Sequence, residues 1–99
     1  MSVTTEPAQD LLEQTSESQH PHCIVCGQAG DCGLGLRFRS LPDGSVEAQF
    51  ACPERYQGYE GMLHGGVTSS LLDGAMTNCL FAHGIAAVTA EMTIRFRHP

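Results

Sequence analysis

The chain has 99 residues, a formal net charge of −6 and 41% hydrophobic residues. This length allows one domain. A chain this short buries only a modest fraction of its surface, so it depends on a partner subunit, a metal ion or a very compact core for stability. Five arginines and no lysine argue against nucleic acid as a partner, because nucleic-acid binding requires a basic surface.

The sequence predicts neither membrane insertion nor export. No run of 18 apolar residues is present, and the first twenty residues lack the basic and apolar regions of a secretory signal. Without an export signal, the five cysteines are expected to be reduced thiols or metal ligands rather than a disulfide framework. We therefore expect a cytoplasmic protein with no membrane partner.

The N-terminal part of the chain divides into two segments. Residues 1–19 are rich in Ser, Thr, Glu and Gln, which predicts a disordered tail or at most a short helix around Leu11. Residues 20–35 combine cysteine, histidine and glycine, a composition typical of a tight, irregular loop. The folded domain is expected to cover residues 20–99.

A hairpin is predicted for residues 36–51. Apolar residues alternate with charged and polar ones on both sides of Pro42-Asp43-Gly44, and this tripeptide has the composition of a turn. Residues 52–63 contain Gly58 and Gly61 and are expected to be an irregular connection.

A long helix is predicted from Gly65 to about His83, because apolar residues recur there at intervals of three and four. Gly84 then provides a C-terminal cap. A helix with so few charges is usually enclosed by other elements. Strict alternation of apolar and polar residues predicts a final strand at residues 87–97. Three strands cannot wrap a helix of this length, so the domain is predicted to be incomplete.

The start of the predicted helix carries His64-Gly65-Gly66, and Asp73 follows seven residues after Gly66. Two glycines leave the first N–H groups of the helix unobstructed, and the helix dipole favours negative charge at this end. The alternative is that the glycines only allow close backbone packing. Gly66 and Asp73 are separated by roughly 10 Å along the helix axis. One helix cannot bring both beside a single reacting carbon, because catalytic contacts require about 3 Å.

This motif, with Gln57 and Gly58 upstream, resembles the hotdog-fold thioesterases, in particular the branch of the phenylacetic-acid-degradation thioesterases and the human thioesterase-superfamily members. The similarity covers about residues 23–98. It implies an α+β hotdog fold, in which an antiparallel sheet wraps around a long central helix, and a homodimer or a dimer of dimers. The family domain has further strands, so a partial hotdog domain is expected at residues 20–99, with the C-terminal strands missing. The 99-residue chain is accordingly expected to be poorly active or aggregation-prone.

The resemblance also implies an activity, the hydrolysis of an acyl-CoA to a free acid and coenzyme A at a dimer interface. The Gly65 N–H is expected to hold the oxyanion. Asp73 of the other subunit would be the nucleophile or the general base, and the alternative is a structural polar group. Thr89 would help to orient the water or the carboxylate. The alternative is that Thr89 has no catalytic role and is an ordinary β-branched residue of a strand.

The remaining residues of the predicted site lie around the helix start. His64 is expected to order the loop through hydrogen bonds rather than to act as a base. Gly66, Gln57 and Gly58 are the expected substrate-binding residues. Relatives often carry an asparagine at the position of Gly58, and the neighbouring Gln57 is the candidate to replace its amide.

A metal site is the rival interpretation for the N-terminal loop. Cys23, Cys26, Cys32 and His20 are residue types that bind tetrahedral zinc, although cysteines in such a loop also serve as small apolar residues. No cofactor is expected beyond the coenzyme A of the substrate, with zinc as the minor alternative. Three functions therefore remain open, namely acyl-CoA hydrolysis, non-catalytic binding of an acyl or aryl thioester, and a small zinc-binding module.

Overall fold

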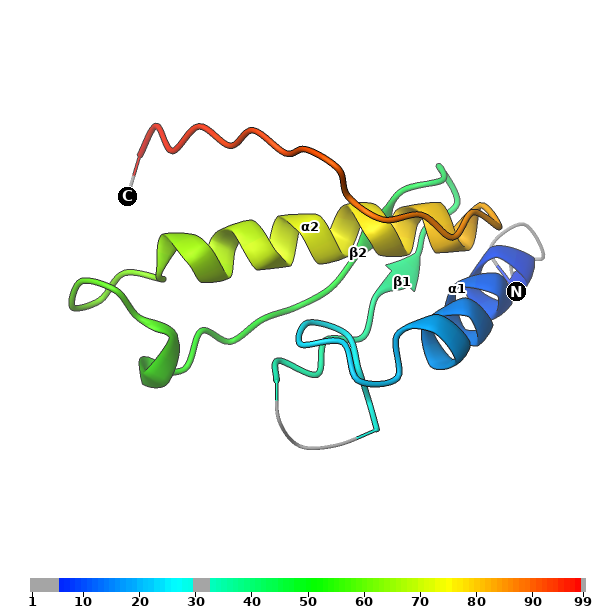
Figure 1. The fold of residues 1–99 in the computed structure, drawn as a ribbon, viewed down its shortest axis with the longest axis horizontal. Coiled ribbons are helices and arrows are strands. Elements are labelled where there is room, and N and C mark those ends of the chain that lie inside the picture. Colours follow the sequence, from blue (N-terminus) through cyan, green and yellow to red (C-terminus); the bar gives the residue numbers. More distant parts are fainter. Residues whose placement is uncertain (1–5, 30–32, 99) are drawn as a thin grey trace.

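The computed structural model describes residues 6–29 and 33–98. Its described part is α+β, as the sequence predicted. In chain order, the elements are α1 (Glu6–Gln19), β1 (Arg39–Ser40), β2 (Val46–Glu47), a single 3-10 turn at Glu54–Tyr56, and α2 (Gly65–Ala82). Figure 1 shows α2 along the long dimension of the molecule, with α1 and the β1–β2 hairpin gathered around its C-terminal half.

Helix α1 is longer than the short helix expected around Leu11. Leu12 is only 3% exposed and belongs to the same hydrophobic core as Phe81 of α2. The Gln9 amide joins α1 to the hairpin, since its Oε1 accepts from the Ser40 N–H at 2.6 Å and its Nε2 donates to the Phe38 carbonyl at 3.3 Å. Packing against α2 explains the length, because tertiary contacts stabilise short helices more than intrinsic propensity does.

The predicted hairpin is confirmed, with a shorter ladder. β1 and β2 pair antiparallel, with Arg39 opposite Glu47, and these two side chains form an ion pair. Gly44 occupies the turn with φ 88°, a left-handed conformation that glycine adopts without strain. The ladder ends early because the segment before β1 pairs elsewhere: the Leu36 N–H donates to the Val25 carbonyl at 2.8 Å.

Helix α2 has the bounds that the sequence predicted, and Gly84 ends it in a left-handed conformation with φ 78°. Its enclosure is only partial. Phe81 and Asn78 are each 1% exposed, facing α1 and the N-terminal loop, whereas another set of apolar side chains on α2 remains exposed. This exposed apolar row consists of Leu72, Met76 and Leu80.

The prediction of a strand at residues 87–97 is wrong, because the structure has no strand there. The segment runs as an extended chain back along α2, towards the start of the helix (Figure 1). No residue from 86 to 98 shares a backbone hydrogen bond with another described residue. Alternation reveals the tendency to form a strand, but a strand also needs a partner for its backbone groups. Val88 is 93% exposed as a result.

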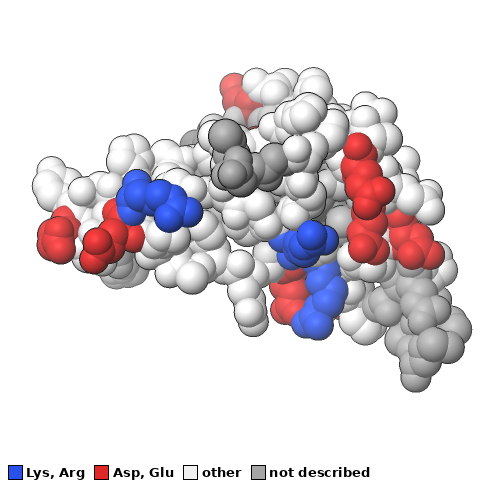
Figure 2. Space-filling model, turned by 90° about the horizontal axis from the view of Figure 1, so that it is seen from below, with Lys and Arg blue, Asp and Glu red and all other residues white. Residues whose placement is uncertain are grey.

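Charged side chains are distributed without a dominant patch on the face drawn in Figure 2. Small groups of acidic and basic residues are separated by uncharged surface, and no continuous basic area is visible among the residues described there. Within residues 6–29 and 33–98, no helix is both long enough and apolar enough to span a membrane.

Candidate functional site

The loop before α2 folds back on itself and brings five predicted site residues together. The His64 N–H donates to the Tyr56 carbonyl at 2.9 Å, and Gln57 forms a bridge with Leu63. Gly58 lies against His64, because a Cβ built on Gly58 would be 3.5 Å from the His64 Cα. We call this group the helix-start cluster. Its members are Gln57, Gly58, His64, Gly65 and Gly66.

His64 organises the first turn of α2 as its N-terminal cap. Its Nδ1 accepts from the Gly66 N–H at 2.9 Å, and its carbonyl accepts from the Thr68 N–H at 3.0 Å. A Cβ on Gly66 would be only 3.1 Å from this ring nitrogen, so glycine allows the ring to fold over the helix start. The Gly66 N–H is therefore occupied, whereas no described residue accepts from the exposed Gly65 N–H.

Gln57 uses its amide oxygen within the loop. Its Oε1 accepts from the Gly61 N–H at 3.1 Å, and Gly61 has a φ of 77° at this turn. In the structure, the Gln57 side chain therefore holds the loop that precedes His64. Its amide nitrogen has no acceptor among the described residues.

Asp73 and Thr89 form the second half of the predicted site. The Thr89 Oγ1 donates to the Asp73 Oδ1 at 2.5 Å. Asp73 is half-buried on α2, and Thr89 is exposed on the extended segment. This hydrogen bond joins two residues that are 16 positions apart in the sequence. The second carboxylate oxygen of Asp73 accepts no hydrogen bond from the described residues.

The two halves do not meet within one chain. Asp73 follows Gly65 by eight helical residues, which corresponds to roughly 12 Å along the axis of α2. Phe96 lies beside the helix start instead, because its Cζ is 3.7 Å from the position of a Cβ on Gly65. No sequence motif pointed to Phe96, which belonged only to the apolar face of a predicted strand.

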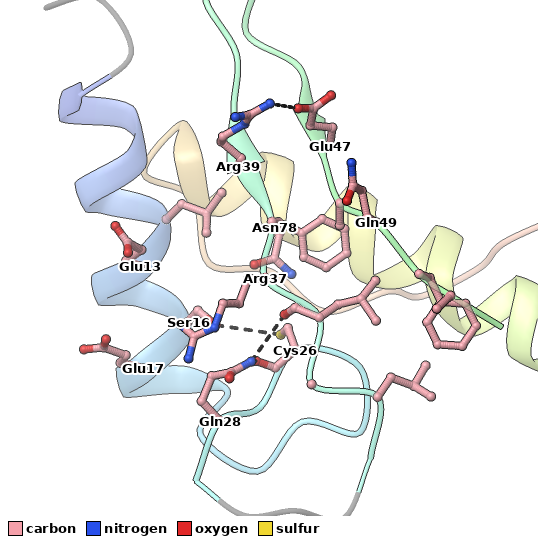
Figure 3. A pocket seen from close by; sticks show the side chains of 18 of the residues that line it. Glu13, Ser16, Glu17, Cys26, Gln28, Arg37, Arg39, Glu47, Gln49 and Asn78 are labelled. Atoms are coloured by element: carbon pink, nitrogen blue, oxygen red, sulfur yellow. Dashed lines mark hydrogen bonds and ion pairs between the residues drawn. The ribbon is translucent and has the colours of Figure 1, made fainter. Parts of the chain in front are cut away.

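Two cavities lie apart from Asp73. One of about 900 Å³ opens between α1, the N-terminal loop and the hairpin, and its walls carry Glu13, Glu17, Arg37 and Arg39 (Figure 3). No residue of the helix-start cluster lines it, so we do not connect it with the predicted chemistry. A smaller and mostly apolar cavity of about 330 Å³ lies nearer the helix start. It is lined by Ile24, Gly33, Leu34, Tyr56, Val67 and Ser70.

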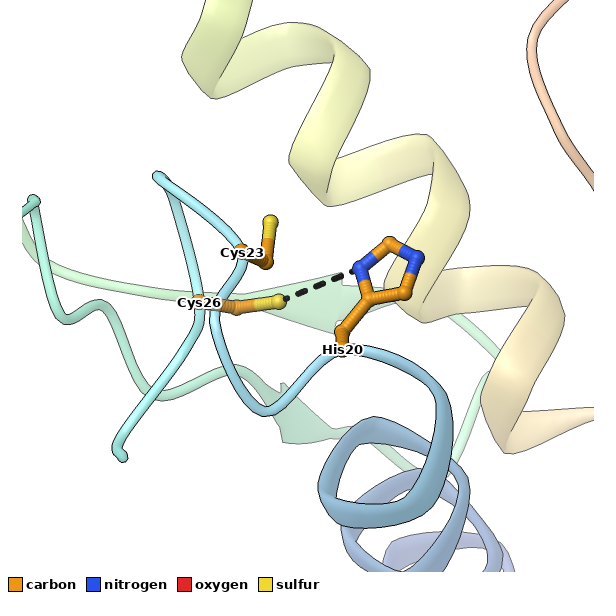
Figure 4. Close-up of side chains that lie close together, drawn as sticks. All are labelled: His20, Cys23 and Cys26. Atoms are coloured by element: carbon orange, nitrogen blue, oxygen red, sulfur yellow. Dashed lines mark hydrogen bonds between the residues drawn. The ribbon is translucent and has the colours of Figure 1, made fainter. Parts of the chain in front are cut away.

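Three of the four metal candidates lie together, as Figure 4 shows for His20, Cys23 and Cys26. Their ligand atoms all lie within 4.8 Å of one another. Cys26 is 4% exposed, and burial raises the pKa of its thiol, opposed by hydrogen bonds from Asn78 and Ser16. The fourth candidate, Cys32, lies outside the described residues.

Comparison with known proteins finds one family to which the C-terminal part of the chain is similar. Residues 60–99 match the model of the thioesterase superfamily. That segment contains α2, Asp73 and Thr89, and by this match it is similar to the thioesterase superfamily. The match supports thioester hydrolysis as the general type of activity and agrees with the resemblance that the sequence motifs carried. Neither the curated proteins nor the solved structures include a significant match to the chain.

Proposed function

We propose that the protein hydrolyses an acyl-CoA to a free acid and coenzyme A, at a site to which two subunits contribute. The observation that carries this proposal is the hydrogen bond between Thr89 and Asp73, within the segment that matches the thioesterase superfamily. A carboxylate held in one orientation by a hydroxyl group suits either nucleophilic attack or the activation of a water molecule.

The start of α2 supplies the oxyanion site in this proposal. The Gly65 N–H is exposed and has no acceptor among the described residues, while His64 occupies the neighbouring Gly66 N–H. The helix dipole adds partial positive charge at the same end. A thioester carbonyl placed there would have its developing negative charge stabilised by a fixed backbone donor.

Asp73 supplies the reactive group. In the general-base route, Asp73 removes a proton from water, the oxygen attacks the thioester carbon, the C–S bond breaks, and the coenzyme A sulfur takes up a proton. In the nucleophilic route, the Asp73 oxygen attacks the thioester carbon, the C–S bond breaks, and coenzyme A leaves and takes up a proton at its sulfur. Water then hydrolyses the resulting anhydride, which releases the free acid and restores the Asp73 carboxylate. Thr89 positions one carboxylate oxygen and leaves the other free to react in both routes.

A second copy of the chain is required because Gly65 and Asp73 are separated by roughly 12 Å along one helix. If two α2 helices lie antiparallel and overlap over their N-terminal halves, the start of one helix lies beside Asp73 of the other. The exposed apolar row on α2 supports such an arrangement, since a homodimer interface is usually more apolar than the rest of the surface.

The decisive experiment replaces Asp73 with Asn and measures release of free thiol from a panel of acyl-CoAs. We expect kcat/KM to fall by roughly 1,000-fold, as is typical when the general base or nucleophile is removed. Asp10→Asn is the matched control, because Asp10 is an exposed carboxylate on α1, and this variant should retain wild-type activity. Unchanged hydrolysis by Asp73→Asn would remove Asp73 from the mechanism.

A further inference from the structure

The N-terminal loop holds a compact group of three soft ligands, remote from the helix-start cluster in the sequence. We infer that His20, Cys23 and Cys26 bind a zinc ion at the end of α1, beside the C-terminal half of α2. The inference concerns residues that the proposed hydrolysis does not use, so the two proposals stand or fall independently. Figure 4 shows the three side chains converging on one point beside α2.

The separation of the ligand atoms fits a tetrahedral ion. The Cys26 Sγ and the His20 Nδ1 are 3.7 Å apart. Zinc binds sulfur at about 2.3 Å and nitrogen at about 2.0 Å, and tetrahedral angles then place the two ligand atoms about 3.6 Å from each other. The ligand atoms of all three residues lie within 4.8 Å, so small side-chain movements would complete the geometry.

The backbone of the loop positions Cys23 and Cys26 so that both can bind the same metal ion. The Val25 N–H points at the Cys23 Sγ at 3.4 Å, and the Gly27 N–H donates to the Cys23 carbonyl at 2.8 Å. A Cβ on Gly27 would lie 2.5 Å from the Cys23 nitrogen, so only glycine permits this tight turn. The turn brings both sulfurs within 4.8 Å of the His20 ring nitrogen, and the Val25 N–H stabilises negative charge on the Cys23 sulfur.

Neighbouring side chains orient Cys26 and His20. The Ser16 hydroxyl of α1 lies 3.7 Å from the Cys26 Sγ, and the His20 ring packs edge-on against Phe81 with 5.0 Å between the ring centroids. Such contacts outside the ligand set orient ligands and raise the affinity of a metal site. An ion bound here would therefore hold the loop against the end of α1 and keep the His20 ring packed on Phe81 of α2.

The ligand chemistry selects zinc. Two thiolates and one imidazole are the soft and borderline ligands that zinc prefers, whereas calcium and magnesium require oxygen. His20 and Cys23 are only partly buried, so an ion can enter and a water molecule or another thiol can occupy the fourth position. Binding releases the protons of both thiols, and the affinity therefore rises with pH.

The test uses the full chain, purified under reducing conditions and freed of metal with a chelator. Cobalt(II) is the spectroscopic probe. We expect one equivalent to produce a thiolate-to-cobalt charge-transfer band with the visible absorption of a tetrahedral site, and one equivalent of zinc to abolish both. Zinc should also raise the melting temperature, because it binds the folded state.

Variants locate the ligands. Cys23→Ser, Cys26→Ser and His20→Gln should each weaken zinc binding roughly 100-fold or more, because each removes on the order of a third of the binding free energy. Cys79→Ser is the matched control, since this half-buried cysteine on α2 contacts the Gly44 carbonyl instead, and it should bind zinc like the wild type. Circular dichroism of the metal-free variants separates loss of ligands from loss of the fold.

Two results would overturn the inference. The first is a reduced wild-type chain that gives no charge-transfer band at stoichiometric cobalt. The second is a band that persists at the same affinity in both Cys23→Ser and Cys26→Ser. Neither result bears on the proposed hydrolysis, which is tested separately with the variant Asp73→Asn.

Discussion

The hydroxyl of Thr89 donates to the Oδ1 of Asp73 at 2.5 Å and so attaches the extended C-terminal segment to the middle of α2. The contact fixes one oxygen of a half-buried carboxylate, and the other oxygen has no hydrogen-bond donor among the described residues. Further along the same segment, Phe96 reaches the start of the helix. The extended segment therefore contacts both the carboxylate of the proposed site and the surroundings of the proposed oxyanion position.

Removal of the Thr89 hydroxyl should lower the activity without abolishing it. A hydrogen bond to a charged group contributes about 1.5–3 kcal/mol, so Thr89→Val should reduce kcat/KM by roughly 10- to 100-fold. Thr89→Ser keeps the donor and should retain most of the activity. Thiol release from acyl-CoA measures both variants. Full activity in Thr89→Val together with a loss in Thr89→Ser would show that the methyl group, rather than the hydroxyl, matters.

The composite site predicts that two inactive variants complement each other. Asp73→Asn removes the reactive carboxylate, and Gly66→Ala places a Cβ 3.1 Å from the His64 ring, which disturbs the helix start. In a mixed dimer, one of the two sites combines an intact helix start with an intact Asp73. After unfolding and refolding of an equal mixture, about one quarter of wild-type activity should return, given random pairing in a two-fold dimer.

The control for complementation is each variant refolded alone, which should remain at its own low activity. A mixture that shows only the average of the two single variants would place both functional groups on the same chain. Size-exclusion chromatography of the refolded mixture checks that dimers have formed.

The sequence predicted the parts of the fold that local chemistry determines. The turn at Pro42-Asp43-Gly44 and the bounds of α2 were correct because turn residues, apolar spacing and the Gly84 cap act over a few residues. The length of α1 was not predictable, since it depends on Leu12 reaching a core on α2. The predicted final strand was wrong because alternation cannot supply a pairing partner.

The same distinction applies to the candidate sites. His64, Gly65 and Gly66 are neighbours in the chain, and their gathering with Gln57 and Gly58 follows from a short loop. The contact of Thr89 with Asp73 was expected only through the family resemblance. Phe96 beside Gly65, and Phe81 against His20, join distant parts of the chain and had no signal in the sequence.

The substitution Gly74→Ala should lower the stability of the fold, because Gly74 packs against the N-terminal loop. A Cβ at this position would lie 2.6 Å from the Cγ1 of the buried Val25. Overpacking costs about 1–3 kcal/mol, whereas alanine gains about 1 kcal/mol over glycine in a helix interior. Gly74→Ala should therefore lower the free energy of unfolding by roughly 1 kcal/mol, measured by urea denaturation.

The double variant Val25→Ala/Gly74→Ala tests the cause. Shortening Val25 removes the overlap, so the double variant should be more stable than the sum of the single effects by about 1 kcal/mol. Strictly additive losses would mean that the added methyl group meets something other than Val25, or that the loop moves away at no cost.

Asp43 in the hairpin turn should make the stability depend on pH below neutrality. Its Oδ1 accepts from the Ser45 N–H at 3.0 Å and from the Ser45 hydroxyl at 2.5 Å, and these hydrogen bonds lower the pKa of Asp43 from its ordinary value of 3.8. The charged form is therefore favoured in the folded state. Its stabilising effect is complete above pH 3.8 and is lost as the pH falls through the lowered pKa of the folded state.

The comparison of wild type with Asp43→Ala isolates this effect, because the other carboxylates titrate alike in both. Wild type should be the more stable at pH 6, as measured by urea denaturation, and the difference should shrink as the pH falls below 3.8. Asp43→Asn keeps an oxygen acceptor without a charge, so its stability relative to Asp43→Ala should not change with pH. A difference between wild type and Asp43→Ala that stays constant down to the acid limit would show that the carboxylate charge plays no part in the turn.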